Sequence, residues 1–441
     1  MELNVLAATE SVPFFGLLFP TVLILFTCLL IWRACDGFEV ASEYIGRNLS
    51  EGVRGGTINA ISSSLPELFT TLIALFILSD KDGFSVGIGT TAGSALFNGM
   101  IIPAACILAV VGAVVMGKKV VSVNVSTKVL LRDGLSLILC EFILILLING
   151  PSLYWWQGLV LMAMYVAYLV YMLTSMKTVE GSDEDEEGEI LAEGDGSRTL
   201  FGSVFYWLSG GPLMDLEGFF VKEKHEQQIK EETWNGWPLL LSSSAVIGVA
   251  CFMLVKACEW LGSGPGNESH QHYELFGMQL EGFGMPTMFV AVIFASMATS
   301  VPDTVMSIRD ARDGDYDDAV ANALGSNIFD VCFALGLPLF LYTIINGPIV
   351  MSPEIAHQSG ELRLLLLVLT VVGFLVYFIG KRGHTASGVP YVEMKRGKAF
   401  LLLFIYLAFV VFVVGRSVKA TWAEQISSWI GDVLSLLPSI G

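Results

Sequence analysis

Three carboxylic acids stand inside apolar stretches of this sequence: Glu67, Asp303 and Asp330. A charged side chain at the centre of a membrane-spanning segment costs at least about 2.5 to 3.5 kcal/mol, so each acid needs a neutralising partner. The apolar residues around them supply no lysine or arginine for a structural ion pair. Bound cations or protons are therefore the expected partners. The alternative, protonated acids that only form packing hydrogen bonds, does not explain why acids recur at matched positions of two similar segments.

Small side chains that carry oxygen surround these acids in the sequence. Calcium takes six to eight oxygen ligands at about 2.3 to 2.6 Å, whereas zinc and copper sites use histidine and cysteine, which these motifs lack. Close helix packing explains any single serine or threonine equally well, but the cluster favours a site for a hard cation. The oxygen-bearing residues are Ser62, Ser63, Ser64, Thr70, Ser94, Asn98, Thr299, Ser300, Ser326 and Asn327.

Pro66 and Pro302 each stand directly before one of the acids. A proline inside a helix removes one backbone hydrogen bond and displaces the carbonyl four residues earlier, here those of Ser62 and Ala298. We therefore expect a helix break at each proline, with carbonyl oxygens beside the two carboxylates. Proline kinks also occur in membrane helices without a function, but two kinks at equivalent positions favour a role in the site.

These residues belong to an internal repeat. SSSLPELFTT at 62–71 matches ATSVPDTVMS at 298–307, and GSALFN at 93–98 matches GSNIFD at 325–330. Five predicted spans separate the two copies, so the copies cross the membrane in opposite senses. Such inverted-topology repeats are typical of transporters, in which a site between the repeats opens to either side in turn.

The elements that position these residues are predicted to be transmembrane helices. The chain is 54% hydrophobic and 15% charged, with mean hydropathy +0.67, which is typical of a protein whose surroundings are lipid. Backbone polar groups in lipid need partners within their own segment, so each span must be helical. We predict an all-α membrane protein of ten transmembrane helices in two inverted halves of five, at about 13–32, 53–78, 86–116, 129–149, 154–176, 238–261, 284–308, 318–346, 362–380 and 399–418.

The distribution of lysine and arginine predicts the orientation. All but five of the 24 lysines and arginines lie in or beside the odd-numbered connections between predicted spans, which are therefore expected to be cytoplasmic. The five others are Lys81, Lys256, Arg363, Arg416 and Lys419. The resulting domains are a first transmembrane half at 1–176 with one repeat at about 53–116, a cytoplasmic loop at 177–236, a second half at 237–420 with the other repeat at about 284–346, and a short tail at 421–441.

The loop at 177–236 is strongly acidic and opens with EGSDEDEEGEILAEGDGS. This composition predicts a solvated and partly disordered linker. DEDEEG at 183 imitates the start of an EF-hand calcium loop, but Gly194 stands where the twelfth position requires a bidentate glutamate. A solvated charge run is therefore the preferred interpretation.

On the two repeat motifs, the chain resembles the calcium/cation antiporter superfamily, and within it the potassium-dependent sodium/calcium exchangers. SLPELFTT with GSALFN and TSVPDTVMS with GSNIFD resemble the paired α-repeats of that family. The likeness extends to CDGFEVASEYIGRNLSEGV before the first repeat and from LLRDGLSLILCEF to WWQGL after it, but it includes neither the 177–236 loop nor the tail. One departure is Ser62, which stands where relatives usually have a glycine.

The resemblance implies ten helices in two inverted halves and exchange of entering sodium for leaving calcium. Glu67 and Asp303 would be the principal calcium ligands, shared with sodium, and Asp330 holds the position whose acid accompanies potassium dependence. No resident cofactor is implied, and the partners would be the lipid bilayer and the transported calcium, sodium and potassium ions. Other positions that match the family's site are Ser63, Ser64, Ser94, Asn98, Thr299, Ser300 and Ser326.

Several alternatives remain open from the sequence. A potassium-independent sodium/calcium exchanger or a calcium/proton exchanger would use the same acids, while the five histidines all lie outside the predicted spans. A cation channel belongs to another class and would conduct faster than a carrier. An intramembrane aspartyl protease needs two buried acids, but the acids here lack catalytic spacing. Nucleotide-binding motifs are absent, so ATP-driven pumping is not expected, nor is binding to nucleic acid. The sequence does not distinguish the plasma membrane from an organellar membrane.

Overall fold

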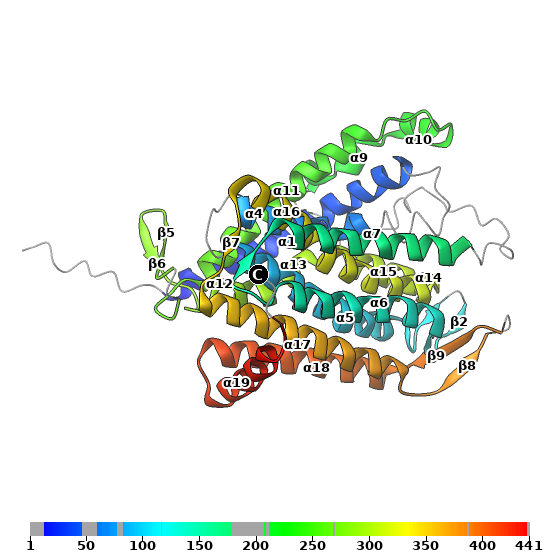
Figure 1. Ribbon diagram of the computed structural model, residues 1–441. Coiled ribbons are helices and arrows are strands. Elements are labelled where there is room, and N and C mark those ends of the chain that lie inside the picture. Colours follow the sequence, from blue (N-terminus) through cyan, green and yellow to red (C-terminus); the bar gives the residue numbers. More distant parts are fainter. Residues whose placement is uncertain are drawn as a thin grey trace, which may run out of the picture.

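The structure is a computed structural model of a helical bundle (Figure 1). Long helices run side by side, and short strands lie at both ends of the bundle. The residues that the structure describes are 13–45, 60–76, 83–115, 117–177, 207–208, 211–267, 270–385 and 388–438.

Seven helical segments of the described chain are long and apolar enough to cross a membrane. Their exposed surfaces carry large apolar side chains such as Phe15, Leu25, Val170 and Phe404, as expected of helices that face lipid. The chain is therefore a multi-pass integral membrane protein. The seven segments are α1 (Pro13–Ile45), α5 (Gly83–Val110), α7 (Trp155–Lys177), α11 (Trp237–Gly262), α15 with η4 and α16 (Tyr316–Asn346), α17 (Pro353–Phe378) and α18 (Arg396–Ser417).

An eighth span results if two helices that meet at a bend of 43° are counted together. The first part comprises α12 (Thr287–Val290), a π-helix η3 (Ala291–Ala295) and α13 (Ser296–Thr299), and the second is α14 (Val301–Asp313). Two other predicted spans are not among these crossings in the described part of the chain. Helix α4 (Leu65–Phe76) has 12 residues, about 18 Å at 1.5 Å per residue, and α6 (Thr127–Leu147) carries four charged residues. The predicted total of ten spans thus stays a prediction.

Each repeat copy contains a helix that is interrupted just before its acid. The short helix α3 (Ala60–Ser63) ends one residue before Ser64, and α4 begins at the next residue. In the second copy, α13 ends one residue before Ser300 and α14 begins directly after it. In both copies the interruption lies two residues before the proline, which is the second residue of the new helix. Proline is well tolerated there, because the first turn of a helix leaves its N–H groups unpaired anyway.

The short strands show which connections lie at the same end of the bundle. Strand β3, before α6, pairs with β9, before α18, and β9 also pairs with β8. Strand β4, after α6, pairs with β7 before α17 at the opposite end (Figure 1). The strand bounds are β1 Val114–Val115, β2 Lys118–Lys119, β3 Val123–Ser126, β4 Ser152–Leu153, β5 Tyr273–Leu275, β6 Met278–Leu280, β7 Ile349–Val350, β8 Arg382–His384 and β9 Pro390–Met394.

The described part of the 177–236 loop folds against the end of the bundle. A 3-10 turn η2 (Gly211–Met214) precedes the helices α9 (Leu216–Phe220) and α10 (Glu223–Lys230). The backbone N–H of Trp234 donates a 2.7 Å hydrogen bond to the hydroxyl of Tyr44 on α1, and the two rings pack edge to face. This part of the loop is therefore attached to α1. The acidic run at 183–195 lies outside the described residues.

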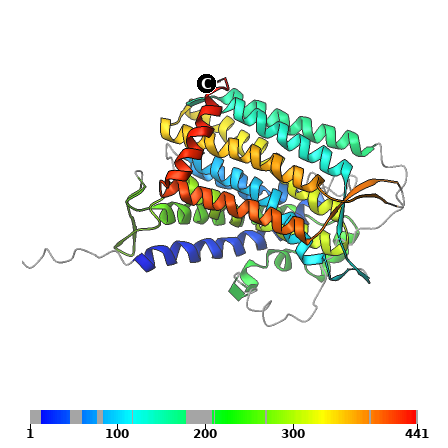
Figure 2. The same ribbon diagram turned by 90° about the horizontal axis from the view of Figure 1, so that it is seen from below.

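The chain ends on a helix that turns away from the long helices. After α18, α19 (Thr421–Ser435) runs across the ends of α17 and α18 (Figure 2). Arg416 holds this corner, because its guanidinium pairs with Glu361 of α17 at 2.9 Å and with Glu424 of α19 at 2.5 Å. The predicted tail at 421–441 is thus mostly helical in the described residues.

Candidate functional site

The repeat motifs meet in the interior of the bundle, where helices of both copies pack on one another. Ser94 on α5 donates a 3.0 Å hydrogen bond to Oε1 of Glu67 on α4. The Ser94 hydroxyl also lies 3.2 Å from that of Thr299 on α13, in the other copy. All three side chains are fully buried. The first carboxylate thus lies at a contact between the copies.

The second carboxylate is held in the same way by residues of both copies. Ser326 on α15 donates to Oδ1 of Asp303 on α14 at 2.7 Å, and Asn98 on α5 donates to Oδ2 at 3.1 Å. Ser326 in turn lies 3.4 Å from the hydroxyl of Ser63. Asp303 is therefore bound by its own copy and by the opposite one.

The third acid, Asp330, begins the π-helix η4 (Asp330–Ala334) between α15 (Tyr316–Phe329) and α16 (Leu335–Asn346). It is fully buried, and the described residues give neither of its carboxylate oxygens a hydrogen-bond partner. Other buried oxygens of the motifs share this property: Oε2 of Glu67, Oδ1 of Asn98 and the hydroxyls of Ser64 and Ser300. Unpartnered buried oxygens are costly, and a bound cation would satisfy several of them at once.

No described lysine or arginine forms an ion pair with these three acids. Within the described chain, no three histidine, cysteine, aspartate or glutamate side chains converge closely enough to form a metal site by themselves. A cation here would therefore take its remaining ligands from hydroxyl and amide oxygens. The structure brings the predicted residues of the two copies together through the hydrogen bonds of Ser94, Asn98 and Ser326.

Another fully buried acid, Glu141 on α6, lies outside both repeat copies. Thr370 of α17 donates a 2.8 Å hydrogen bond to its Oε1, while its Oε2 has no partner. The repeat pattern does not predict this residue. Its position in the apolar run LILCEFILIL does predict it, by the same argument that selects the other three acids.

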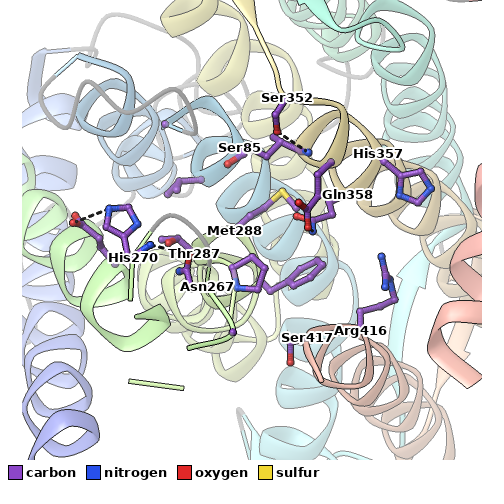
Figure 3. A pocket seen from close by; sticks show the side chains of 18 of the residues that line it. Ser85, Asn267, His270, Thr287, Met288, Ser352, His357, Gln358, Arg416 and Ser417 are labelled. Atoms are coloured by element: carbon purple, nitrogen blue, oxygen red, sulfur yellow. Dashed lines mark hydrogen bonds and ion pairs between the residues drawn. The ribbon is translucent and has the colours of Figure 1, made fainter. Parts of the chain in front are cut away.

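A large cavity lies elsewhere, at the end of the bundle where α5, α12 and α17 begin. It has a volume of about 880 Å3, and none of the predicted site residues lines it. Figure 3 shows its mixed polar lining, which includes His270, His357, Gln358 and Arg416. His270 lies 3.5 Å from Glu259 within this lining. The cavity is thus a polar recess at one end of the bundle, and the three buried acids do not line it.

Fold and site together define a class of protein: a polytopic helical membrane protein with paired, broken helices and uncompensated buried acids. The profile of the family described as sodium/calcium exchanger protein matches residues 19–174 and 235–415. The chain belongs to this family, and the resemblance seen in the repeat motifs is confirmed. The stretch left unmatched between the two segments contains the acidic loop.

Individual relatives agree with this assignment. The chain is 24% identical over 461 residues to sodium/potassium/calcium exchanger 5 of Homo sapiens, covering 89% of this chain and 82% of the relative. It is 41% identical over 141 residues to sodium/potassium/calcium exchanger 3 of Homo sapiens, covering 31% of this chain and 20% of the relative. Its fold resembles the crystal structure of the H+/Ca2+ exchanger CAX, with a TM-score of 0.50 and 10% identity, over 96% of this chain and 92% of that one.

Proposed function

We propose that this protein is a secondary active antiporter that exchanges sodium for calcium by alternating access. The observation that carries the proposal is the contact between the two repeat copies at their acids. Glu67 and Asp303 each receive a hydrogen bond from a serine of their own copy. Asn98 and Thr299 then connect the two copies at the same place. A cation bound there would be shared by two elements that move relative to each other.

In this proposal Glu67 and Asp303 are the principal calcium ligands, and sodium occupies the same region in the other half of the cycle. The two carboxylates balance the charge of one calcium ion. Calcium's six to eight oxygen ligands would be completed by neutral groups of both copies. These are Ser63, Ser64, Ser94, Asn98, Thr299, Ser300 and Ser326, with the breaks before Pro66 and Pro302 leaving helix ends beside the site.

Potassium co-transport is the finer part of the proposal and depends on Asp330. This acid adds a third negative charge to a fully buried region. One calcium ion neutralises two carboxylates, so about one negative charge remains for a monovalent cation. Relatives named as sodium/potassium/calcium exchangers support this proposal.

The proposed architecture is ten helices in two inverted halves, 1–176 and 237–420, joined by the acidic loop at 177–236. Pairing of β3 with β9 places two odd-numbered connections together, and pairing of β4 with β7 does the same for two even-numbered ones. Both pairings agree with ten crossings. The excess of lysine and arginine in the odd connections favours a cytoplasmic loop.

Radioactive calcium flux into proteoliposomes tests the function. The full chain is reconstituted, and sodium, potassium and pH are set independently on the two sides. We expect calcium uptake that requires an outward sodium gradient at constant pH. Uptake driven by a proton gradient without sodium would instead identify a calcium/proton exchanger. Single-channel currents far above a carrier's turnover would replace the proposal with a cation channel.

A further inference from the structure

A second, smaller cavity lies deep in the bundle between α5, α6, α15 and α17. Its volume of about 20 Å3 is room for a single water molecule or ion. Most of its lining is apolar, but three polar side chains also line it: Asn327, Thr370 and Tyr377. This pocket is called the inner cavity below.

The hydrogen bonds of the three polar side chains decide what each can offer to a ligand in the cavity. The Asn327 amide donates to the carbonyl of Ala95 at 2.8 Å, which fixes the orientation of the amide and leaves Oδ1 without a partner. The Thr370 hydroxyl donates to Glu141 at 2.8 Å, and the Tyr377 hydroxyl donates to the carbonyl of Gly99. Thr370 and Tyr377 therefore have only oxygen lone pairs left for a ligand, and Asn327 has the unpartnered Oδ1 together with a second N–H that no described hydrogen bond uses.

A buried carboxylate near the inner cavity supplies the negative charge that a bound cation needs. Glu141 is fully buried, and Thr370 is the only hydrogen-bond partner that the described residues give its carboxylate. The thiols of Cys140 and Cys332 are titratable groups of the described chain that also lie near Glu141. None of them supplies a positive charge. A single cation in the inner cavity would lie one hydroxyl away from the carboxylate.

We propose that the inner cavity binds a small monovalent metal cation, with Asn327, Thr370 and Tyr377 as oxygen ligands and Glu141 as the counter-charge. One carboxylate calls for a single positive charge rather than a divalent ion. A water molecule would satisfy Oδ1 of Asn327 but would leave the carboxylate of Glu141 without a counter-charge. A proton on Glu141 would neutralise the charge but would leave Oδ1 of Asn327 without a partner.

The inner cavity lies behind the transport site on the same helices. Ala95 and Gly99 directly follow Ser94 and Asn98 on α5, and Asn327 directly follows Ser326 on α15. Successive helix residues point about 100° apart, so one face of each helix serves the buried acids and the adjacent face serves the cavity. A cation bound here would hold α5, α15 and α17 together.

Thermal unfolding of the full chain in lipid nanodiscs tests the proposal independently of transport. The background variant that combines Glu67→Gln, Asp303→Asn and Asp330→Asn removes the charges of the proposed transport site but leaves the inner cavity intact. Sodium chloride, exchanged for choline chloride at constant ionic strength, should raise the unfolding temperature of this background by several degrees. A parallel series with potassium chloride identifies which of the two ions the cavity prefers.

Adding Thr370→Val to the background should remove the cation-dependent shift, because valine keeps the shape but not the oxygen. The matched control is Thr343→Val, whose hydroxyl donates to its own helix at Leu339 and does not line the cavity; it should keep the shift. If Thr370→Val does not fold, Tyr377→Phe serves the same purpose. The proposal is overturned if neither ion stabilises the background, if the shift survives both cavity variants, or if stability follows only pH. Failure of this test leaves the flux experiment, and hence the exchanger proposal, unaffected.

Discussion

The two repeat copies share a plan but differ in how they pack and in their charge. In each copy a helix restarts before an acid, and a serine at the same motif position donates to that acid: Ser94 to Glu67 and Ser326 to Asp303. The difference lies at the end of the second motif. Asn98 of the first copy is hydrogen bonded across to Asp303, whereas the equivalent Asp330 has no partner for either oxygen.

Packing differs at the glycine that opens the same motif. A Cβ on Gly93 would lie 2.1 Å from the carbonyl oxygen of Val292 and 2.7 Å from the side chain of Ser296. A Cβ on the equivalent Gly325 would meet only the Tyr168 hydroxyl, at 3.8 Å. The first copy therefore supplies a close helix contact, and the second supplies the additional charge and a π-helix. The two similar motifs therefore have different physical roles.

The largest effect is expected where the copies are alike. Glu67→Gln and Asp303→Asn each replace a charged, potentially bidentate ligand by one neutral acceptor. Each should lower sodium-driven calcium flux at least about a hundredfold, which corresponds to about 2.8 kcal/mol. Flux per folded protein in proteoliposomes measures this, with membrane insertion as the control. Retained calcium exchange in either variant would refute the ligand assignment.

A smaller effect should separate the two glycines. Gly93→Ala forces a methyl group against the backbone of η3, and overpacking of this kind costs about 1 to 3 kcal/mol. We expect lower thermal stability and a flux reduced about tenfold. Gly325→Ala is the matched control and should stay close to the unmodified protein, since its methyl group meets ordinary contacts. Equal losses in both variants would mean that the asymmetry between the copies is not a matter of packing.

Much of this asymmetry could not be predicted from the motifs. The buried acids and their neighbours Ser94 and Ser326 could be predicted from the sequence, because a charge in an apolar run is a strong local signal. The close approach at Gly93 depends on how α5 crosses η3, and a sequence motif does not contain that crossing. The helix breaks at Ser64 and Ser300 lie in the turn before each proline, where the missing proline N–H removes a backbone hydrogen bond. The motif thus indicates that a break exists but not its exact residue.

The spans show a similar limit. Long apolar helices such as α5 and α18 were predicted close to their observed bounds, whereas α4 is shorter than its predicted stretch and α6 carries buried charges. Hydropathy averages over a window and does not register a break within it. Glu141 lies outside the repeats, and its neighbour Thr370 comes from a helix far away in the sequence. Only the fold brings them together.

The smallest effect on calcium flux is expected where the copies differ most. Asp330→Asn makes the second copy match Asn98 of the first, removing one negative charge while keeping one oxygen acceptor and nearly the same shape. Because Glu67 and Asp303 still balance calcium, sodium-driven calcium flux should persist within a few-fold. Its stimulation by potassium should disappear, since the charge that a monovalent cation would balance is gone.

The measurement compares calcium flux with and without potassium, on the sodium-free side, for Asp330→Asn and the unmodified chain. Asp330→Glu keeps the charge and is the matched control, in which potassium stimulation should survive. If the unmodified protein exchanges sodium for calcium equally well without potassium, the potassium assignment fails and Asp330 is protonated or serves sodium alone. If Asp330→Asn instead loses all calcium flux, the acid is a ligand on the same footing as Glu67 and Asp303, and the difference between the copies has no role in ion choice.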